Sequence, residues 1–172
     1  MKTFMGFGLL LVVLASCKTS RLQSTTIEKE KITTVLDNWH LAAAQARFDT
    51  YFYHMTADAV FIGTDPTENW QVAEFKSYSK PYFDKGKAWN FTSLQRNIYI
   101  SADQKTAWFD ELLDTQMKIC RGSGILKKQN GKWKIAHYVL SIAIPNERTD
   151  DVIKLKTPFD DKLMDQLRSP SK

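Results

Sequence analysis

The sequence has 172 residues, of which 43% are hydrophobic and 25% charged, and a formal net charge of +5. This length suits one folded domain with a proper hydrophobic core, and no internal repeat or low-complexity segment interrupts it. The small basic excess excludes a nucleic-acid-binding protein, because such a surface needs more positive charge with arginine or aromatic residues interleaved.

The first 16 residues have the form of a bacterial lipoprotein signal peptide. Lys2 supplies a positive start, and the apolar run from Phe4 to Leu14 is too short to span a bilayer as a folded helix. The run ends on Leu14-Ala15-Ser16-Cys17, which matches the lipobox, where the cysteine is acylated after export. We expect cleavage after Ser16 and lipidation of Cys17; an ordinary signal peptide cut nearby is the alternative.

Lipidation of Cys17 would fix both the location and the redox state of the protein. We expect a polar tether over residues 17–26 and a protein anchored in the cell envelope, facing the periplasm or the exterior. Lys18 after the cysteine favours the outer membrane. Cys120 is then the remaining cysteine, so no intrachain disulfide forms, and its apolar neighbours predict a buried, inert thiol.

Two helices are predicted at the start of the domain. The stretch Glu28–Phe48 places apolar residues at helical spacing, and Asp49 can cap a second, short helix. His40 and His54 lie on these helices without a ligand-spaced partner, so we expect surface or second-layer positions and no metal site.

A strand, a loop and a third helix follow. Ala59–Gly63 predicts a short strand and Thr64–Glu68 a loop, because proline and Asx-type residues offer the backbone local alternatives to regular structure. Apolar residues recur at helical spacing over Trp70–Lys85, where Pro81 predicts a kink or an early stop.

Four strands are predicted in the second half of the chain, since aromatic and β-branched residues dominate there. The Asn130-Gly131 pair predicts a tight hairpin. Helices followed by an antiparallel meander give an α+β class. The four runs are Trp89–Ser101, Thr106–Gln116, Met117–Gln129 and Lys132–Ile144.

The polar C-terminal tail, residues 148–172, is expected to be loosely packed or disordered. Asp160–Leu167 is the one segment in it with a helical apolar face.

The alternation of the last strand predicts which side chains face the helices. Trp133, Ile135, His137 and Ser141 share one face, which we expect to be the inner one. In an earlier strand Asp110 and Glu111 stand among apolar residues, so at least one of these carboxylates must face the core and needs a partner there.

These segments resemble the SnoaL-like branch of the nuclear transport factor 2-like superfamily over about residues 27–147. The resemblance rests on Asp58-Ala59-Val60-Phe61, Arg121-Gly122-Ser123-Gly124 and Gly131-Lys132-Trp133-Lys134-Ile135-Ala136-His137, followed by Ser141. It implies a cone-shaped, cystatin-like fold, with helices packed on a curled antiparallel sheet around one pocket, and dimerisation through the outer face of the sheet. Val139 stands where many relatives have a second pocket histidine, and the aspartate and tyrosine pair of ketosteroid isomerases has no match.

The candidate site residues each have a structural alternative. His137 is a general acid or base, or a core histidine satisfied by Asp110 or Glu111. Arg121 binds a ligand carboxylate, or neutralises a buried acid. Asp65 rims the pocket, or caps a helix in solvent. The remaining candidates, which either line the pocket or pack in the core, are Trp39, Trp70, Tyr82 and Ser141.

Three functional hypotheses follow. The first is a cofactor-free binding module for a small, largely apolar ligand, tethered to the membrane through Cys17. The second is an acid–base enzyme of the isomerase, dehydratase or hydrolase type that uses the same pocket. The third is an accessory domain that dimerises without a ligand. The fold alone does not separate them.

Overall fold

The computed structural model describes residues 7–169, with side chains from Gln23 onward. The cleavage site at Ser16 and the lipidation site at Cys17 have side chains outside this described part, so both remain predictions. The chain divides into two units, Met1–Ile142 and Ala143–Lys172, which are treated separately below. Among the described residues, no helix combines the length and apolar character needed to cross a membrane.

The first unit contains three helices and six strands in its described part, in the order that the sequence predicts. β1 is longer than expected, and the short β2 was not predicted. The elements are α1 (Phe7–Ala44), α2 (Phe48–Tyr53), β1 (Met55–Ile62), β2 (Asn69–Gln71), α3 (Val72–Asp84), β3 (Thr92–Ile100), β4 (Thr106–Thr115), β5 (Lys118–Gln129) and β6 (Lys132–Ile142).

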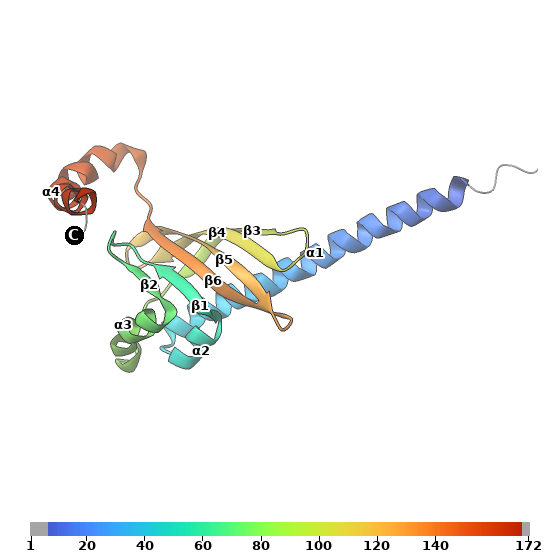
Figure 1. Ribbon diagram of the computed structural model, residues 1–172, viewed down its shortest axis with the longest axis horizontal. Coiled ribbons are helices and arrows are strands. Elements are labelled where there is room, and N and C mark those ends of the chain that lie inside the picture. Colours follow the sequence, from blue (N-terminus) through green and yellow to red (C-terminus); the bar gives the residue numbers. More distant parts are fainter. Residues whose placement is uncertain (1–6, 170–172) are drawn as a thin grey trace, which may run out of the picture. The chain divides into compact units, whose positions relative to one another are not determined.

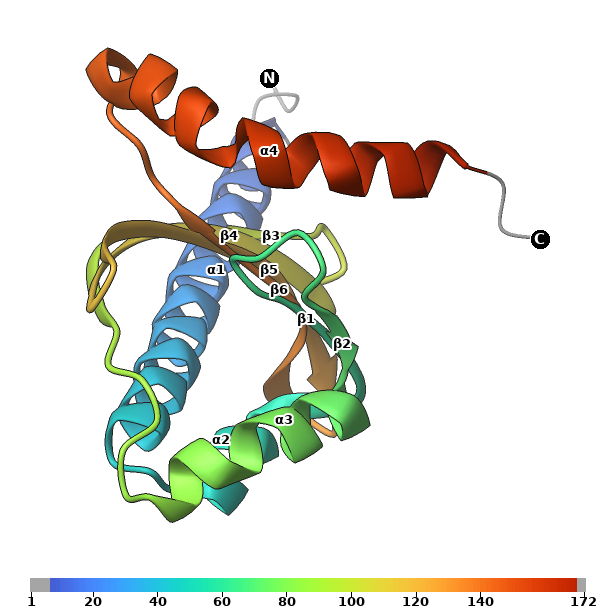
Figure 2. The ribbon, with the colours of Figure 1, turned by 90° about the vertical axis from the view of Figure 1, so that its left-hand side faces the viewer.

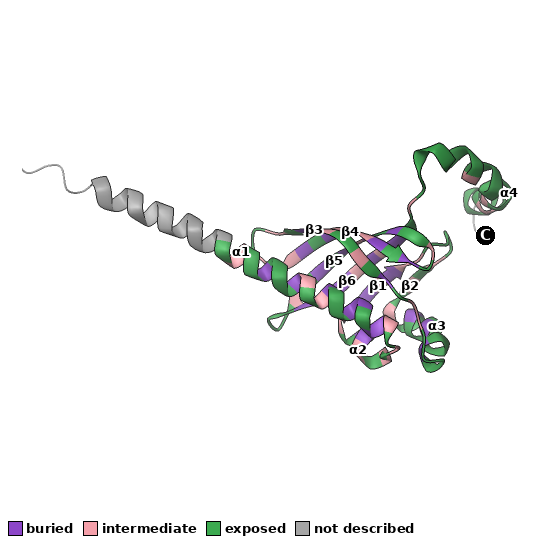
Figure 3. Ribbon diagram, turned by 180° about the vertical axis from the view of Figure 1, so that it is seen from behind, coloured by how far each residue is buried: buried purple, intermediate pink, exposed green. Residues whose placement is uncertain are grey.

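α1 covers one face of the sheet, and no helix in the described part of the first unit covers the other (Figures 1 and 3). The helix is continuous from Phe7, so the predicted tether at residues 17–26 is helical. Its apolar face is buried against the strands, as the spacing predicts; the fully buried members of this face are Ile32, Leu36, Trp39, Ala42 and Ala43.

The sheet is curled around this helical side, which confirms the cone-shaped α+β fold (Figure 2). Its strand order is β2-β1-β6-β5-β4-β3. All neighbouring pairs are antiparallel except β1 with β6, which are parallel. The predicted hairpin joins β5 to β6, where Asn130 and Gly131 both have positive φ values of 49° and 76°, as a type I′ turn requires.

α3 packs beside β1 and β2 at one end of the sheet. A capping box between Gln71 and Glu74 begins it, since the Gln71 backbone N–H donates to Glu74 Oε2 at 3.0 Å. Pro81 does not stop the helix, which continues to Asp84. Proline has no backbone N–H, so the last turn continues with one hydrogen bond fewer.

The core of the first unit is unusually rich in aromatic rings. Trp39 stacks on Tyr51 at 4.9 Å between ring centroids and meets Tyr138 edge-on at 4.8 Å. Phe61 stacks on Phe75 at 4.1 Å. All five rings are buried, so they bind α1, α2, α3 and the sheet into one apolar body. Cys120 is a free, buried thiol, as predicted.

The second unit consists of a short 3-10 helix, Asn146–Arg148, and α4 (Thr149–Arg168). The helix is therefore longer than the predicted Asp160–Leu167 and passes through Pro158. None of its residues is buried, in line with the expected loose packing. The order in this segment comes from local helix formation, helped by Asp150 and Asp151 in the first turn.

Candidate functional site

A β-bulge in β6 reverses the predicted facing of His137. Ile125 of β5 lies opposite His137, but the next residue, Leu126, lies opposite Ile135, so Ala136 is an extra, unpaired residue. Because side chains alternate along a strand, one extra residue exchanges the two faces beyond it. The prediction that His137 points into the cone is therefore wrong.

Beyond the bulge, Tyr138 and Leu140 occupy the inner face, and His137, Val139 and Ser141 lie on the outer face. Ser141 is exposed, which corrects its predicted place in the pocket. The alternation of the last strand holds only as far as Ile135.

Arg121 and Asp110 also lie on the outer face. Arg121 is exposed and lies opposite Leu112 and Ser141 in the sheet register. Asp110 accepts a hydrogen bond from Asn97 Nδ2 at 3.0 Å. The structure therefore brings neither residue to the interior, and Arg121 does not neutralise a buried acid.

Glu111 is the carboxylate that faces the core, as the sequence requires of one member of this pair. It is 1% exposed, and His40 Nε2 donates to its Oε1 at 2.8 Å. Tyr138 donates to the same oxygen at 3.2 Å, and Arg96 Nε donates to Oε2 at 2.9 Å. Asp37 holds the other side of Arg96 through a 2.7 Å contact with its Nη1.

Gly122 makes room for this cluster. A Cβ at that position would lie 2.2 Å from the Tyr138 hydroxyl and 3.1 Å from Glu111 Cγ. Any larger residue would therefore push the tyrosine away from the carboxylate.

The cluster holds Glu111 as an anion. Burial acts to raise the pKa of Glu111, but the hydrogen bond and charge of His40 and the charge of Arg96 outweigh it and lower this pKa below its ordinary value. Burial and the neighbouring Glu111 charge raise the pKa of Tyr138 well above its usual range. A carboxylate with three partners and a lowered pKa is a stabilising anion and a poor proton donor.

His40 and Arg96 are the members of this cluster that the sequence analysis did not identify. His40 is 4% exposed, which rules out the surface position and leaves the second-layer alternative. Its position was readable, because it lies four residues after Leu36 and eight after Ile32 on the buried face of α1. Its Nδ1 is buried and has no hydrogen-bond partner in the described part of the chain.

A cavity of about 150 Å³ lies between the loop after β1, α3, the segment before β3 and the β4–β5 turn. We call it the mouth cavity. Its walls are mainly aromatic, with Glu68, Thr64 and Gln116 as the polar exceptions. The lining residues are Phe61, Gly63, Thr64, Glu68, Trp70, Phe75, Tyr78, Trp89, Phe91, Gln116, Met117 and Leu140.

The aromatic rings form a stacked wall. Trp70 lies between Phe75 and Tyr78, with ring centroids 5.6 Å and 4.4 Å away and interplanar angles of 19° and 26°. Phe75 also stacks on Trp89 at 5.9 Å. Burial and the neighbouring groups Tyr82 and Glu68 raise the pKa of Tyr78 to about 12, so this phenol stays neutral.

The loop after β1, from Gly63 to Trp70, contributes four residues to the cavity: Gly63, Thr64, Glu68 and Trp70. Trp70 lines it, as expected, and so does Glu68. Gly63 leaves space for this glutamate, since a Cβ there would lie 2.1 Å from Glu68 Oε2. Asp65 does not line the cavity; it accepts from the backbone N–H and hydroxyl of Thr67, which lower its pKa in the exposed loop.

The other predicted aromatic residues lie elsewhere. Trp39 packs in the core, and Tyr82 is exposed on α3. Neither lines the mouth cavity, so the structure does not bring them together with Trp70 as a cavity wall.

A single layer of rings separates the mouth cavity from the Glu111 cluster. Phe91 lines the cavity and lies 5.9 Å from the His40 ring, edge to face. Phe61 lines it and stacks on Tyr138 at 5.5 Å. A ligand in the cavity would therefore contact the rings of Phe61 and Phe91, and these rings separate it from the buried charges of the Glu111 cluster. No group of three or more His, Cys, Asp or Glu side chains in the described part of the chain could hold a metal ion.

Comparisons with known proteins agree with the fold. The family model of the SnoaL-like domain matches residues 32–145. No curated protein matches the chain.

Similar solved structures share the fold at low sequence identity. An NTF2-like protein of unknown function from Pseudomonas putida has a TM-score of 0.58 at 15% identity, over 72% of this chain and 91% of that one. A protein with a cystatin-like fold from Nostoc punctiforme has a TM-score of 0.55 at 12% identity, over 67% and 90%. The association domain of CaMKII from C. elegans has a TM-score of 0.57 at 20% identity, over 69% and 98%.

Proposed function

Because this chain belongs to the SnoaL-like domain family, we propose that its mouth cavity binds a small, flat, largely apolar molecule. The stacked wall of Trp70, Phe75 and Tyr78 is the observation that carries this proposal, since aromatic faces favour flat apolar ligands. An apolar cavity of about 150 Å³ accommodates benzene. The cavity volume of about 150 Å³ therefore favours a single-ring compound.

Glu68 gives this ligand a polar handle. It lines the cavity beside Thr64, while Arg121 and His137, the residues first expected to grip a carboxylate, lie on the outer face. A carboxylate accepts hydrogen bonds when ionised. The ligand class is therefore a ring that carries an N–H or O–H donor.

Mass spectrometry of small molecules that co-purify with the protein tests this proposal. Trp70→Ala should lose the ligand, and Met117→Phe should exclude it by filling the cavity without removing a wall. Tyr82→Ala is the matched control, because Tyr82 is an exposed aromatic residue of α3 that does not line the cavity. Equal ligand retention by all three variants would refute the cavity as the binding site.

An acid–base enzyme is the second candidate, and the position of Glu68 favours it. Glu68 is the carboxylate among the residues that line the cavity, so it is the group able to move a proton there. Glu68→Gln separates the two functions. If the domain only binds, the variant retains the same compound more weakly; if it is an enzyme, the variant retains a different compound, the unconverted substrate.

We also propose that Cys17 is lipidated and that the protein resides in the cell envelope, most favourably at the outer membrane. The lipobox Leu14-Ala15-Ser16-Cys17 behind an apolar run supports this. Mass spectrometry of the mature N-terminus should find a diacylglyceryl cysteine at position 17. Cys17→Ser should release the protein from the membrane fraction or leave it unprocessed.

The outer face of the sheet supports a homodimer. Tyr99, Trp108, Ile125, His137 and Val60 form one row across it, because each lies opposite the next in the strand register. The first three side chains are 47%, 48% and 39% exposed, which is high for large apolar groups. One similar structure is an association domain. A dimer from which no ligand co-purifies would favour the accessory-domain hypothesis over the binding module and the enzyme.

A further inference from the structure

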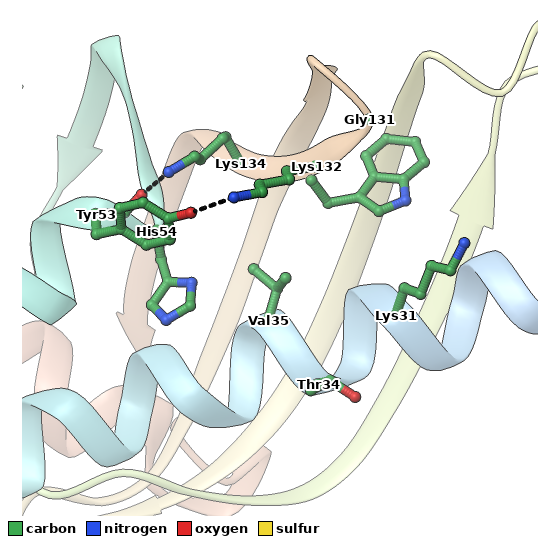
Figure 4. A pocket seen from close by; sticks show the side chains of 9 residues that line it. Lys31, Thr34, Val35, Tyr53, His54, Gly131, Lys132 and Lys134 are labelled. Carbon is green, nitrogen blue, oxygen red and sulfur yellow. Dashed lines mark hydrogen bonds between the residues drawn. The ribbon is translucent and has the colours of Figure 1, made fainter.

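A second hollow, of about 310 Å³, lies between α1, the end of α2 and the start of β6 (Figure 4). We call it the lysine hollow. It shares no lining residue with the mouth cavity. Its lining residues are Lys31, Thr34, Val35, Tyr53, His54, Gly131, Lys132, Trp133 and Lys134.

The walls of the lysine hollow are tied together by the backbone. Ile135 at the start of β6 donates its backbone N–H to the carbonyl of His54 at 2.8 Å. The Asn130-Gly131 turn sets where β6 begins. The hollow is therefore shaped by sheet and helix and does not depend on a flexible loop.

The charges around the hollow are all positive. Among the residues whose side chains the structure describes, three lysines and one histidine line it, and no carboxylate does. Lys31 is paired with Glu28 at 2.8 Å. Lys132 and Lys134 have no carboxylate within ion-pair distance in the described part of the chain.

Tyr53 provides two uncharged hydrogen-bond acceptors, its hydroxyl and its backbone carbonyl, for the ammonium groups of Lys132 and Lys134. Lys132 Nζ donates to its hydroxyl at 3.0 Å, and Lys134 donates to its backbone carbonyl (Figure 4). Lys134 Nζ also lies 3.4 Å from the centroid of the tyrosine ring. The arrangement holds two like charges side by side at the rim.

Burial is the main cause of the pKa shifts of His54 and Lys134, and neighbouring positive charges add to it, whereas Tyr53 raises the pKa of Lys132. Burial, followed by the charges of Lys134 and Arg47, lowers the pKa of His54. Burial and the Lys132 charge lower the pKa of Lys134, against the opposing effect of Tyr53. Positive charges that oppose one another in this way favour an anion between them.

The floor of the hollow is apolar. Val35 of α1 and the buried indole of Trp133 form much of it. A volume of about 310 Å³ is near the lower end for small-molecule sites, which run from ~300 Å³ upward. The hollow thus presents an apolar base beneath a cationic rim.

We propose that the lysine hollow binds a small amphipathic anion, whose short apolar body lies on Val35 and Trp133 and whose carboxylate or phosphate is bound by Lys132 and Lys134. Free amphipathic acids and anionic lipid head groups both have this chemistry. The site is independent of the mouth cavity and of lipidation at Cys17.

Binding of hexyl phosphate tests the proposal, with hexanol and hexylamine as probes that keep the apolar body and change the charge. The chain from Lys18 onward is suitable, because all buried residues of the described part lie between Glu28 and Leu140. Titration calorimetry should give at least tenfold tighter binding for hexyl phosphate than for hexanol. Hexylamine should not bind.

Matched variants assign the site. Lys132→Gln with Lys134→Gln should weaken hexyl phosphate binding at least tenfold, while Lys118→Gln with Lys127→Gln, which removes the same charge from exposed positions of β5, should leave it unchanged. NMR titration of His54 adds a second readout: a bound anion favours the imidazolium, so its pKa should rise on addition of hexyl phosphate. Equal binding of hexanol, or an unchanged affinity in the Lys132/Lys134 variant, would overturn the proposal.

Vesicle sedimentation identifies the source of the anion. Retention of the wild-type chain on phosphatidylglycerol vesicles, but not on phosphatidylcholine vesicles, with loss in the Lys132/Lys134 variant, would assign an anionic lipid. Binding of hexyl phosphate without vesicle retention would assign a free anion. Failure of both would refute the site and leave the mouth cavity proposal untouched.

Discussion

The two faces of β4, β5 and β6 both carry ionisable residues, but these residues differ in their burial and in the number of their partners. On the inner face, Glu111 is closed in by His40, Arg96 and Tyr138. On the outer face, Arg121 and His137 form no ion pair in the described part of the chain. The same strands thus hold a buried anion with three partners on one side, and on the other side solvent-facing groups such as Arg121 and Asp110, of which Asp110 accepts a hydrogen bond from Asn97.

This difference teaches that the face, and not the residue type, decides the role of a charged side chain here. An inner carboxylate must have partners, since a buried charge without them is costly. Outer residues remain available to solvent or to a second subunit. The predictions below test how sharply the two faces differ, from the largest expected effect to the smallest.

Removing the inner anion should be the most damaging change. Glu111→Gln leaves Arg96 and His40 buried beside a neutral amide, and breaking a buried ion pair in this way costs about 3–5 kcal/mol of unfolding free energy. Asp110→Asn, one residue away on the outer face, should cost about 0–1 kcal/mol. Urea unfolding of both variants measures the difference; equal losses would remove the contrast between the faces.

Acid should destabilise the protein through its buried carboxylates. Burial acts to raise the pKa of Glu28, but hydrogen bonds from Lys128, Lys31 and Trp133 lower it from 4.5 to about 2. A lowered folded pKa means that this stabilisation is present above pH 4.5 and is lost as the pH falls towards 2. At 1.36 kcal/mol per pKa unit, the loss amounts to roughly 3 kcal/mol at most.

Unfolding free energies measured across this pH range should show a shallower decline in Glu28→Gln than in the wild type. Glu30→Gln, at an exposed position of the same helix, is the control and should retain the wild-type slope. A Glu28→Gln slope identical to the wild type would contradict the assignment.

Crowding the inner face should cost less than removing its anion. Gly122→Ala places a Cβ 2.2 Å from the Tyr138 hydroxyl, and overpacking of this kind costs about 1–3 kcal/mol. Ser123→Ala, the next residue along β5 but on the outer face, should stay within about 0.5 kcal/mol of the wild type. Thermal unfolding compares them, and a Gly122→Ala protein as stable as Ser123→Ala would show that the cluster can relax.

Changes on the outer face should alter association more than stability. Trp108 stacks on Tyr99 at 5.8 Å, and an exposed cross-strand pair contributes about 0.2–1 kcal/mol. Trp108→Lys should therefore lower the unfolding free energy slightly but shift a dimer towards monomer in sedimentation velocity. Lys118→Glu, at an exposed position near one end of β5, is the control and should leave the dimer intact.

Local patterns in the sequence predict the elements well. The helical face of α1, the four late strands and the Asn130-Gly131 hairpin depend on neighbouring residues, and the structure confirms them. The requirement that Asp110 or Glu111 face inward with a partner also follows from elementary electrostatics, and Glu111 meets it.

The facing of β6 could not be predicted in the same way. Three consecutive residues of β6, Tyr138, Val139 and Leu140, are apolar. The alternation of polar and apolar residues therefore does not reveal the extra residue at Ala136. The partners of Glu111 come from α1, β3 and β6, far apart in the chain, and only the tertiary fold brings them together. Trp70 could be placed at the cavity because of its position at the end of the loop after β1. The sequence does not distinguish Trp39, which lies in the core, or Tyr82, which lies on the surface, from an aromatic residue of the cavity wall.

The position of β6 in the sheet has a consequence for the order of folding. β6 is formed by the last segment of the domain, yet it lies between β1 and β5 and pairs in parallel with β1. β1 can therefore find its central neighbour only after the chain has been completed as far as Ile142. Such long-range pairing slows folding, so we expect the aromatic N-terminal half to stay accessible to chaperones until the final strand arrives.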